Sequence, residues 1–347
     1  MAEERTIDQL SEVVLPGIVE PDALRLSRRA VPMPGPGQVL VRVEATGVSF
    51  AELAMRRGRY YDQPSFPFVP GYDLVGVVAG LGAGVDPALT GRRVAALTKI
   101  GGWTTHALVD AADLVAVPDG VDPVAAETVV VNGITAWQML HRKARIRRGH
   151  TILVHGANGG VGSTLAQLAS AVGVRVIGTA SARHHDVLRA LGIDPVDYRT
   201  EDVPARVREL APDGVDAVFD NVGGRNLTDA WHLLRRGGTL VSYGAASTLD
   251  GSGSAFLPMI KILARMWWWN AAPNGRHAYL YNLWAGRKLT RRSFTARLRT
   301  DLTAVYELVA SGRLVPQVAA TLPLSRTAEA MKLAESRTAV GKVVLIP

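Results

Sequence analysis

The stretch Thr151-Ile-Leu-Val-His155-Gly156-Ala157-Asn158-Gly159-Gly160-Val161-Gly162-Ser163 joins an apolar run to a helical pattern through a cluster of glycines. This order predicts a strand, a tight turn and a helix. Gly156 allows a sharp turn, Gly159 leaves no side chain between the backbone and a pyrophosphate, and Gly162 lets the helix pack close to the strand. We therefore expect a dinucleotide site, with a plain glycine-rich turn as the alternative. The residues expected at the pyrophosphate are Gly156, Ala157, Gly159, Gly160, Val161 and Gly162.

Length and apolar content bound the class of protein. The chain has 347 residues, enough for two domains, and its 48% apolar residues are enough to fill their cores. No apolar run reaches the length of a membrane span, and the N-terminus lacks the basic-then-apolar layout of a signal peptide. A soluble cytoplasmic protein is therefore expected.

The chain contains no cysteine, which excludes disulfides, thiolate nucleophiles, iron–sulfur clusters and zinc held by cysteine. Its eight histidines show no ligand-like spacing, so no metal site is predicted. The net charge is +8, with basic clusters at 142–148 and 287–299. A solvated basic face explains this charge, while binding of nucleic acid or a membrane is the alternative that a basic surface leaves open.

Two patterns follow one another along the chain. Up to about residue 117, short strands between glycine- and proline-rich turns predict a barrel-like β domain. From residue 151 onward strands alternate with helices, which predicts a doubly wound parallel sheet. The strands expected in that sheet are 151–155, 174–179, 217–220 and 239–243. The helices expected are 124–141, 161–172, 184–191, 203–210, 227–235 and 287–309. The last apolar runs, 315–322 and 343–346, are expected to return to the first domain.

The end of the second strand of this sheet indicates the kind of dinucleotide. A carboxylate about 20 residues after the glycines usually binds the ribose diol of NAD. Here Ser181, Arg183 and His184 follow the strand, and no acid occurs before Asp186. Ser181 can donate a hydrogen bond and Arg183 can pair bidentately with a phosphate, which favours the 2′-phosphate of NADPH. The alternative is that Arg183 and His184 only begin an exposed helix.

With these residues in place, the chain resembles the medium-chain dehydrogenase/reductase superfamily. Within it, the chain is most similar to the zinc-free quinone oxidoreductase (zeta-crystallin-like) group and to its vesicle amine transport protein homologue branch. The resemblance covers nearly the whole chain. Its markers are Gly47-Val-Ser49-Phe-Ala-Glu52, Pro70-Gly71-Tyr72-Asp73, Val131-Asn132-Gly133-Ile-Thr135-Ala136, His155–Gly162, Gly178-Thr-Ala-Ser181, Asp220-Asn221-Val222-Gly223-Gly224, Tyr243-Gly244, Trp267-Trp268-Trp269-Asn270 and Gly341-Lys342-Val-Val-Leu-Ile-Pro347.

The resemblance implies an α/β architecture of two domains. A GroES-like β-barrel catalytic domain would comprise 1–125 and 271–347, and a doubly wound parallel-sheet Rossmann domain that binds NADPH would comprise 126–270. Cofactor and substrate would meet in the cleft between the domains. Family members commonly pair through the edges of the Rossmann sheet, so a homodimer is expected, with a strand near 239–243 extending across it.

The resemblance also implies chemistry without a metal. Zinc-dependent members hold their ion through a cysteine after the first barrel strand and a histidine, and the matching positions here are Ser49 and Tyr72. A carbonyl would then be polarised by hydrogen bonds instead of a Lewis acid. The quinone oxidoreductase group commonly has asparagine where this chain has Ser49, which leaves the hydrogen-bonding role of that position open.

The implied activity is a zinc-independent, NADPH-dependent reductase that transfers hydride to a quinone or an α,β-unsaturated carbonyl. The catalytic candidates are Ser49, Tyr60 and Tyr72, since a phenol can donate to a developing enolate; an ordinary half-buried barrel tyrosine is the alternative for Tyr60. Further cofactor-binding candidates are Asn132, Thr135, Ser181, Arg183, His184, Tyr198, Asn221, Val222, Gly244, Ala245 and Lys342. The substrate-pocket candidates are Trp267, Trp268, Trp269 and Asn270, and core or dimer packing is the alternative for the tryptophans.

Two other functions stay open from the sequence. One is an enoyl-thioester or biosynthetic-intermediate reductase, for which the basic stretch 287–299 would suit a phosphopantetheine arm. The other is a non-enzymatic NADPH-binding protein that associates with RNA or a membrane. Oxidation of NADPH by a naphthoquinone or an enone separates the enzymes from the non-enzyme.

Overall fold

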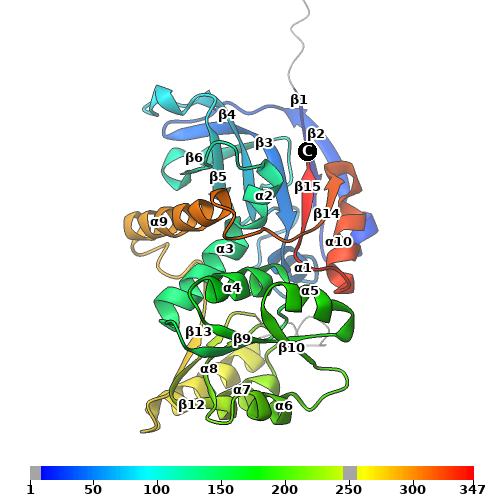
Figure 1. Ribbon diagram of the computed structural model, residues 1–347. Helices are drawn as coiled ribbons and strands as arrows, with labels where there is room; N and C mark the ends of the chain where they lie inside the picture. The colour runs from blue at the N-terminus through cyan, green and yellow to red at the C-terminus, as the bar shows by residue number, and fades with distance from the viewer. Residues whose placement is uncertain (1–8, 245–255) are drawn as a thin grey trace, which may run out of the picture. The chain divides into compact units, whose positions relative to one another are not determined.

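The computed structural model describes residues 9–244 and 256–347, with the side chains of 256–259 left out. The chain forms two compact units, one made of Met1–Val131, Thr290–Gly312 and Pro316–Pro347, the other of Asn132–Leu289 and Arg313–Val315 (Figure 1). The expected boundary at residue 270 needs correction. Strand β13 (His277–Leu280) pairs with β12 (Leu234–Ser242), which places 271–289 in the second unit.

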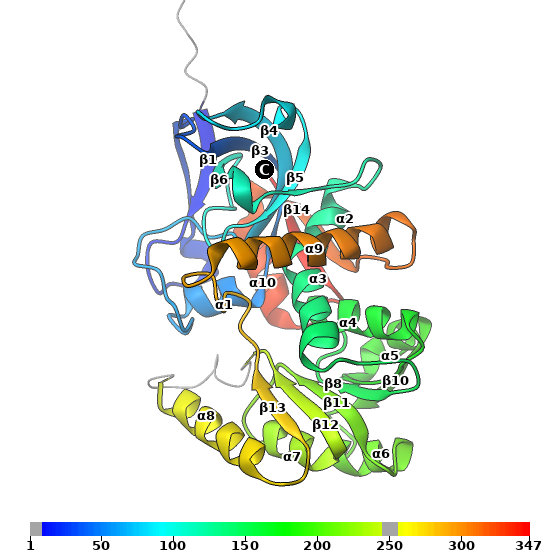
Figure 2. The ribbon, with the colours of Figure 1, turned by 90° about the vertical axis from the view of Figure 1, so that its left-hand side faces the viewer.

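The first unit is built on a seven-stranded sheet with the order β14-β15-β3-β4-β5-β7, in which β6 also pairs with β3. The strands are β3 (Gln38–Val48), β4 (Asp73–Leu81), β5 (Arg93–Leu97), β6 (His106–Asp110), β7 (Val115–Ala116), β14 (Val318–Pro323) and β15 (Lys342–Ile346). The C-terminal strand β15 runs antiparallel to β3. The expected return of the last apolar run to the first domain is therefore confirmed (Figure 2).

Helices and a hairpin complete the first unit. The expected N-terminal strand pair is present as the antiparallel hairpin β1 (Gln9–Val14) and β2 (Arg25–Ala30). Trp103 is fully buried beside this hairpin and β3, and its indole donates to the Gly47 carbonyl at 2.8 Å. The helices are α1 (Phe50–Arg56), α2 (Pro123–Thr128), α9 (Arg291–Ala310) and α10 (Thr327–Ser336). Helix α10 was not expected from the sequence.

The second unit holds a parallel sheet with the order β10-β9-β8-β11-β12-β13. Its other strands are β8 (Thr151–Val154), β9 (Arg175–Ala180), β10 (Ile193–Asp197) and β11 (Val215–Asp220). The four strands expected from the sequence are confirmed as β8, β9, β11 and β12. The pattern missed β10, which contains a proline and two aspartates, and β13, which is only four residues long.

Helices cover both faces of this sheet. They are α3 (Val130–Trp137), α4 (Gly160–Ala171), α5 (His185–Ala190), α6 (Val203–Leu210), α7 (Asn226–Leu233) and α8 (Phe256–Ala271). Figures 1 and 2 show α4 and α5 on one face and α6, α7 and α8 on the other. The expected helix over 124–141 is divided into α2, α3 and a wider helical turn at Gln138–Lys143. Covering both faces explains why the central strands are almost continuously apolar.

The position of β12 corrects the expected dimer geometry. Because β12 lies between β11 and β13, its backbone groups are paired on both sides and it cannot extend the sheet into a second molecule. Within the described residues, the edge of the sheet on this side is β13. A strand near 239–243 is thus an interior strand.

Candidate functional site

The glycine turn is where the second unit offers a place for a pyrophosphate. Strand β8 ends at Val154, and Gly156 adopts a φ of +65°, which favours glycine. Its amide donates to Thr179 Oγ1 at 3.1 Å. Gly159 is the N-cap residue of α4, and no side chain caps this helix N-terminus. The first-turn amides of α4 are therefore available to an anion, which fits the phosphates of a dinucleotide.

Two further glycines of the turn are required by close packing. A Cβ on Gly162 would lie 2.4 Å from the Gly156 carbonyl oxygen, and one on Gly160 would lie 2.3 Å from Asn132 Nδ2. A Cβ on Gly159 would meet only the Gly156 oxygen, at 3.4 Å, which is ordinary contact. Gly162 is thus needed by the fold itself, whereas the described residues would accommodate a side chain on Gly159.

The loop after β11 lies against the same turn. A Cβ on Gly156 would be 3.0 Å from Asn221 Nδ2, and one on Gly244 would be 3.1 Å from the Asn221 carbonyl oxygen. Asp220 holds this loop by accepting from the Val222 amide at 3.2 Å and the Gly223 amide at 3.0 Å. Asn221 Oδ1 is buried and accepts no hydrogen bond within the described part of the chain. A buried acceptor beside the turn suits a polar ligand there, and Ala245 lies outside the described residues.

Asn132 and Thr135 share one face of α3, three residues apart, and both side chains are buried. Asn132 is brought to the glycine turn by its approach to Gly160. Thr135 lies one helical turn further on. These two predicted nicotinamide contacts therefore come from a rigid element of the second unit, while their contact with a cofactor stays a prediction.

The residues predicted at the 2′-phosphate gather where β9 and β10 end. Ser181 follows β9, and Arg183 Nε donates to Ser181 Oγ at 3.3 Å. Tyr198 follows β10 and is half exposed, with the Arg199 guanidinium 5.8 Å from its ring centroid. Arg199, which was not expected here from the sequence, adds a second cation at this place. His184 differs from expectation because it is only 4% exposed and lies inside the unit.

One carboxylate, Asp197, ends β10 directly beside the end of β9. It accepts from the Arg199 amide at 2.9 Å and the Ala182 amide at 3.3 Å. The hydrogen bond from Arg199 lowers the pKa of Asp197, so it is ionised at neutral pH. The carboxylate of Asp197, which was not expected at this place from the sequence, thus accepts hydrogen bonds from backbone amides.

The catalytic candidates of the first unit converge on a residue that the sequence analysis did not single out, Glu52. Ser49 is the N-cap of α1, and its amide donates to Glu52 Oε2 at 2.8 Å; the Ser49 hydroxyl also hydrogen-bonds to that oxygen. The amide of Tyr72 donates to Glu52 Oε1 at 2.6 Å. The Tyr72 hydroxyl in turn lies 2.9 Å from the Tyr60 hydroxyl. Ser49, Tyr72 and Tyr60 are therefore brought together.

Burial sets the protonation of this group. Glu52 is 1% exposed, and desolvation, with a smaller contribution from Asp73, raises its pKa from 4.5 to about 7. Burial also raises the pKa of Tyr60, helped by Tyr72, so the phenol stays neutral and able to donate. The Ser-x-x-Glu spacing of a capping box would have revealed the contact between Glu52 and Ser49, but not that Glu52 is buried.

Lys342 lies in a buried ion cluster of the first unit. Its Nζ is 2.7 Å from Asp73 Oδ2 and 2.6 Å from Glu127 Oε1, and all three side chains are buried. Burial lowers the pKa of Lys342, but the two carboxylates outweigh this and raise it above its usual value. Its ammonium therefore neutralises buried carboxylates, which is a role other than the predicted contact with the cofactor.

The tryptophan cluster at the end of α8 has two kinds of member. Trp269 stacks on Trp231 with ring centroids 4.8 Å apart and, partly buried, packs against the core. Asn270 fastens β13, donating to the Ala278 carbonyl at 2.9 Å and accepting from its amide at 2.8 Å. Both residues thus have structural roles, and their predicted contact with a substrate stays a prediction. Trp267 and Trp268 are about 70% exposed, as expected if part of the cluster faces a partner.

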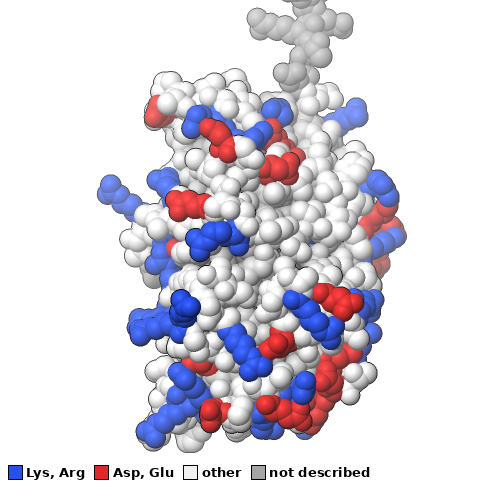
Figure 3. All heavy atoms as spheres, in the orientation of Figure 1, with Lys and Arg blue, Asp and Glu red and all other residues white. Residues whose placement is uncertain are grey.

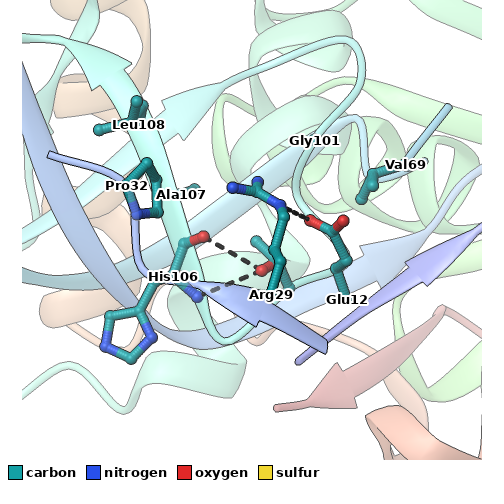
Figure 4. A pocket seen from close by; sticks show the side chains of 9 residues that line it. Glu12, Arg29, Pro32, Val69, Gly101, His106, Ala107 and Leu108 are labelled. Atoms are coloured by element: carbon teal, nitrogen blue, oxygen red, sulfur yellow. Dashed lines mark hydrogen bonds and ion pairs between the residues drawn. The ribbon is translucent and has the colours of Figure 1, made fainter. Parts of the chain in front are cut away.

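A small hollow of the first unit lies apart from these residues. It is lined by parts of β1, β2 and β6, and Figure 4 shows Arg29 and Glu12 joined across one side at 3.0 Å. Its volume of about 240 Å³ is below that of typical ligand pockets. No predicted site residue lines it.

Among the residues that the structure describes, no group of three or more His, Cys, Asp or Glu side chains is arranged to hold a metal ion. Among the same residues, no helix combines the length and apolar character that crossing a bilayer requires.

Comparison with known proteins matches both parts of the chain. A family model described as alcohol dehydrogenase GroES-like domain matches residues 35–119, and one described as zinc-binding dehydrogenase matches residues 191–345. The synaptic vesicle membrane protein VAT-1 homolog of Rattus norvegicus is 36% identical over 348 residues, covering 96% of this chain and 83% of the relative.

Solved structures agree with the sequence comparison. A quinone oxidoreductase of Pseudomonas syringae is 27% identical with a TM-score of 0.82, covering 97% of this chain and 100% of that one. A mycobacterial protein solved in complex with NADPH is 29% identical with a TM-score of 0.81 and the same two coverages. The expected α/β fold with a GroES-like and a Rossmann-like domain is therefore confirmed.

Proposed function

Because the chain belongs to the medium-chain dehydrogenase/reductase superfamily, among the VAT-1 homologues and quinone oxidoreductases, we propose that it is an NADPH-dependent reductase of quinones or α,β-unsaturated carbonyls. An oxidoreductase of this superfamily is what the comparisons establish. The cofactor, the acceptor and the residues that act on them are the proposal. The observation that carries it is the cationic end of β9 and β10, beside a glycine turn with free space for a pyrophosphate.

NADPH is favoured over NADH by the groups after β9. Ser181 offers a hydroxyl, Arg183 a planar fork of donors and Arg199 a second cation, which together suit a dianionic phosphate. The nearby carboxylate, Asp197, already accepts from two backbone amides. The NADPH complex of the mycobacterial relative supports the same choice.

The chain's residues would bind, orient and protonate. A bound reduced nicotinamide supplies the hydride. The turn at Gly159 and the amides of α4 hold the pyrophosphate, while Asn221 offers a buried acceptor beside it. On the first unit, the neutral phenol of Tyr60 is suited to donate a hydrogen bond to the oxygen of a conjugated carbonyl, where negative charge develops.

Replacement of Arg183 by alanine tests the cofactor assignment. Loss of a charge-assisted hydrogen bond to a phosphate removes about 1.5–3 kcal/mol, so NADPH affinity should fall roughly 10- to 100-fold while NADH affinity stays unchanged. Nicotinamide fluorescence titrations with both cofactors measure this. Arg189→Ala is the matched control, since Arg189 is an exposed arginine of the next helix that pairs with Asp186. Equal NADPH affinity in the wild type and the Arg183 variant would remove the assignment.

The acceptor is tested by turnover. NADPH oxidation with a naphthoquinone or an enone is expected, and preference for an enoyl thioester would favour the second enzyme. That alternative has one support on the sequence side, a polyketide synthase of Mycobacterium tuberculosis that is 31% identical over 315 residues, although the match covers only 14% of that protein. Failure with all three acceptor classes, together with salt-sensitive binding of RNA or vesicles, would favour the non-enzyme.

The charge distribution bears on the non-enzymatic alternative. Figure 3 shows basic and acidic side chains interspersed on the face drawn, without one continuous basic area. Several basic residues are also paired: Arg291 contacts Asp110 and Asp113, and Arg235 contacts Asp216. On this face the charges are therefore better explained by a solvated surface than by a binding face for RNA.

We further propose that the protein is a homodimer formed at the β13 edge of the second unit. A sheet edge presents unpaired backbone groups that a second copy can satisfy. Helix α8, which packs on β13, adds exposed apolar side chains at Ile260, Leu263, Trp267 and Trp268. Edge and helix together form a continuous surface suited to a second copy of the chain.

A further inference from the structure

We propose that Glu52 and Ser49 form a proton relay, in which Glu52 supplies through the Ser49 hydroxyl the proton that neutralises the reduced carbonyl of the acceptor. The proposal rests on the proposed reductase function and adds to it the source of the proton. Glu52 and Ser49 both belong to the first unit.

The geometry distinguishes Glu52 from an ordinary capping residue. A capping-box glutamate normally lies on the surface at a helix N-terminus. Glu52 is buried, and its two oxygens have separate partners: Oε1 accepts from the Tyr72 amide at 2.6 Å, and Oε2 faces both the amide and the hydroxyl of Ser49. Ser49 itself is partly exposed. The pair therefore links a buried carboxyl group to the surface of the unit through one hydroxyl.

The direction of the hydrogen bond depends on the charge of Glu52. An ionised carboxylate only accepts, so the Ser49 hydroxyl must donate to it and cannot donate outward. A protonated Glu52 donates to Ser49 Oγ, which also accepts from the Ala51 amide at 3.2 Å. The hydroxyl hydrogen of Ser49 is then released to point toward a ligand. Protonation of Glu52 thus converts Ser49 into an outward donor.

The proton balance of the step is complete. When the β-carbon of an α,β-unsaturated carbonyl receives hydride, its oxygen becomes an enolate. The O–H bond of Ser49 breaks as the O–H bond of the enol forms, and the O–H bond of Glu52 breaks as that of Ser49 is restored. Glu52 is left as a carboxylate and regains a proton from water, and the enol becomes the saturated ketone.

The neighbours of Glu52 keep this titration near neutrality. Burial raises its pKa to about 7, the hydrogen bond from Ser49 opposes this rise, and Asp73 of β4 adds to it. Lys342 of β15 pairs both with Asp73 and with Glu127 of α2. At the other end of α1, Arg56 pairs with Glu335 of α10. The remaining titratable neighbours are the phenols of Tyr72 and Tyr60.

The first experiment needs no turnover. Infrared difference spectra of the full-length protein, recorded against pH, should show a carboxyl group that titrates near pH 7 and disappears in Glu52→Gln. In Ser49→Ala the same group should titrate at higher pH, because the hydrogen bond that stabilises its charged form is gone. Burial also raises the pKa of Glu127, so a second carboxyl signal is expected to be the same in wild type and Glu52→Gln. A spectrum with no carboxyl group titrating above pH 6, or one that Glu52→Gln leaves unchanged, would overturn the proposal.

The second experiment uses an enone acceptor. The wild-type kcat should fall as pH rises above about 7, and Glu52→Gln and Ser49→Ala should each lower kcat about 100-fold and abolish that fall. Ser49→Thr keeps the hydroxyl that Ser49→Ala removes, so this variant should show the pH dependence of the wild type. Asp122→Asn, which removes an exposed capping carboxylate of α2, is the control that should keep the wild-type profile.

The two experiments separate the possible failures. If no acceptor is reduced but the Glu52 titration is present, the proposed function fails while the buried carboxyl group stands. If turnover is normal and the profiles of Glu52→Gln and wild type coincide, the relay is refuted and the reductase is retained. Unchanged NADPH fluorescence titration in both variants shows that the second unit remains folded.

Discussion

Glu52 shows how one buried carboxyl group couples folding to pH. Its pKa in the folded chain is about 7, against an ordinary value of 4.5, so the folded state binds this proton more tightly than the unfolded chain does. The stability associated with it is fully present below pH 4.5 and is lost as pH rises through 7. The whole change corresponds to about 3 kcal/mol.

Substitution of Glu52 by glutamine should remove that dependence. Relative to the wild type, the variant should gain about 3 kcal/mol in unfolding free energy between pH 4 and pH 8, since glutamine has no charge to bury. Urea unfolding at several pH values measures the difference. Asp122→Asn is the control, because it removes the charge of an exposed helix-capping carboxylate. A constant difference between wild type and variant over this range would show that Glu52 is not buried as a titrating acid.

Substitution of Lys342 distinguishes a structural role of this residue from a role in cofactor binding. In Lys342→Met two buried carboxylates lose their counter-ion, which should destabilise the protein by about 3–5 kcal/mol. Lys332→Met removes an exposed pair with Asp22 and should change stability by at most about 1 kcal/mol. Thermal unfolding without cofactor measures both. If Lys342→Met were as stable as wild type but weaker in NADPH binding, Lys342 would be a cofactor ligand.

The strand–turn–helix element from β8 to α4 shows why glycines of one motif are not equivalent. A side chain on Gly162 would collide with the backbone of Gly156, whereas one on Gly159 would meet the Gly156 oxygen only at ordinary contact distance. Gly162 is required by the packing of helix on strand, and the proposed function assigns Gly159 to the pyrophosphate. The spacing in the sequence marks both glycines, but only the tertiary structure separates these two requirements.

Alanine substitutions should separate the two glycines experimentally. Gly162→Ala should lower the unfolding free energy by about 1–3 kcal/mol through overpacking. Gly159→Ala should fold with wild-type stability, because its φ of −74° suits alanine, yet should lose NADPH affinity. Chemical unfolding and fluorescence titration of both variants provide the comparison. Tight NADPH binding by Gly159→Ala would mean that the pyrophosphate lies elsewhere.

For the whole molecule, the proposed dimer depends on the placement of β13 at the edge of the sheet. The short edge strand packs against α8, whose Trp267 and Trp268 are exposed. Apolar side chains of this size at an exposed helix surface are typical of protein interfaces. The residues on which the proposed dimer depends, in α8 and β13, are far along the chain from the predicted catalytic residues Ser49, Tyr60 and Tyr72.

The double substitution Trp267→Ser and Trp268→Ser should dissociate the dimer. Burial of two indoles contributes several kcal/mol to association, so their loss should shift sedimentation velocity from twice the chain mass toward the monomer. Met33→Ser, which removes an even more exposed apolar side chain of the first unit, should leave the dimer intact. A wild-type protein that sediments as a monomer would refute the dimer.

The features that could be predicted are those written in neighbouring residues. The glycine turn, the alternation of strand and helix, and Ser181 with Arg183 after β9 depend on backbone conformation and on side chains close together in the chain, so their spacing was sufficient. The short strands β10 and β13 escaped because their patterns are too brief or too polar to stand out. They form because β10 pairs with β9 and β13 pairs with β12.

The protonation of Glu52, the pairing of Lys342 with Asp73 and the inner position of Trp269 required the tertiary structure. In each case the decisive partner is far away in the chain: Lys342 and Asp73 are 269 residues apart. Burial and charge compensation are properties of the assembled interior. There a low dielectric strengthens the interaction between paired charges and raises the free-energy cost of an unpaired charge. The sequence determined which cofactor chemistry to expect, and the folded chain decided which carboxyl group can hold a proton at neutral pH.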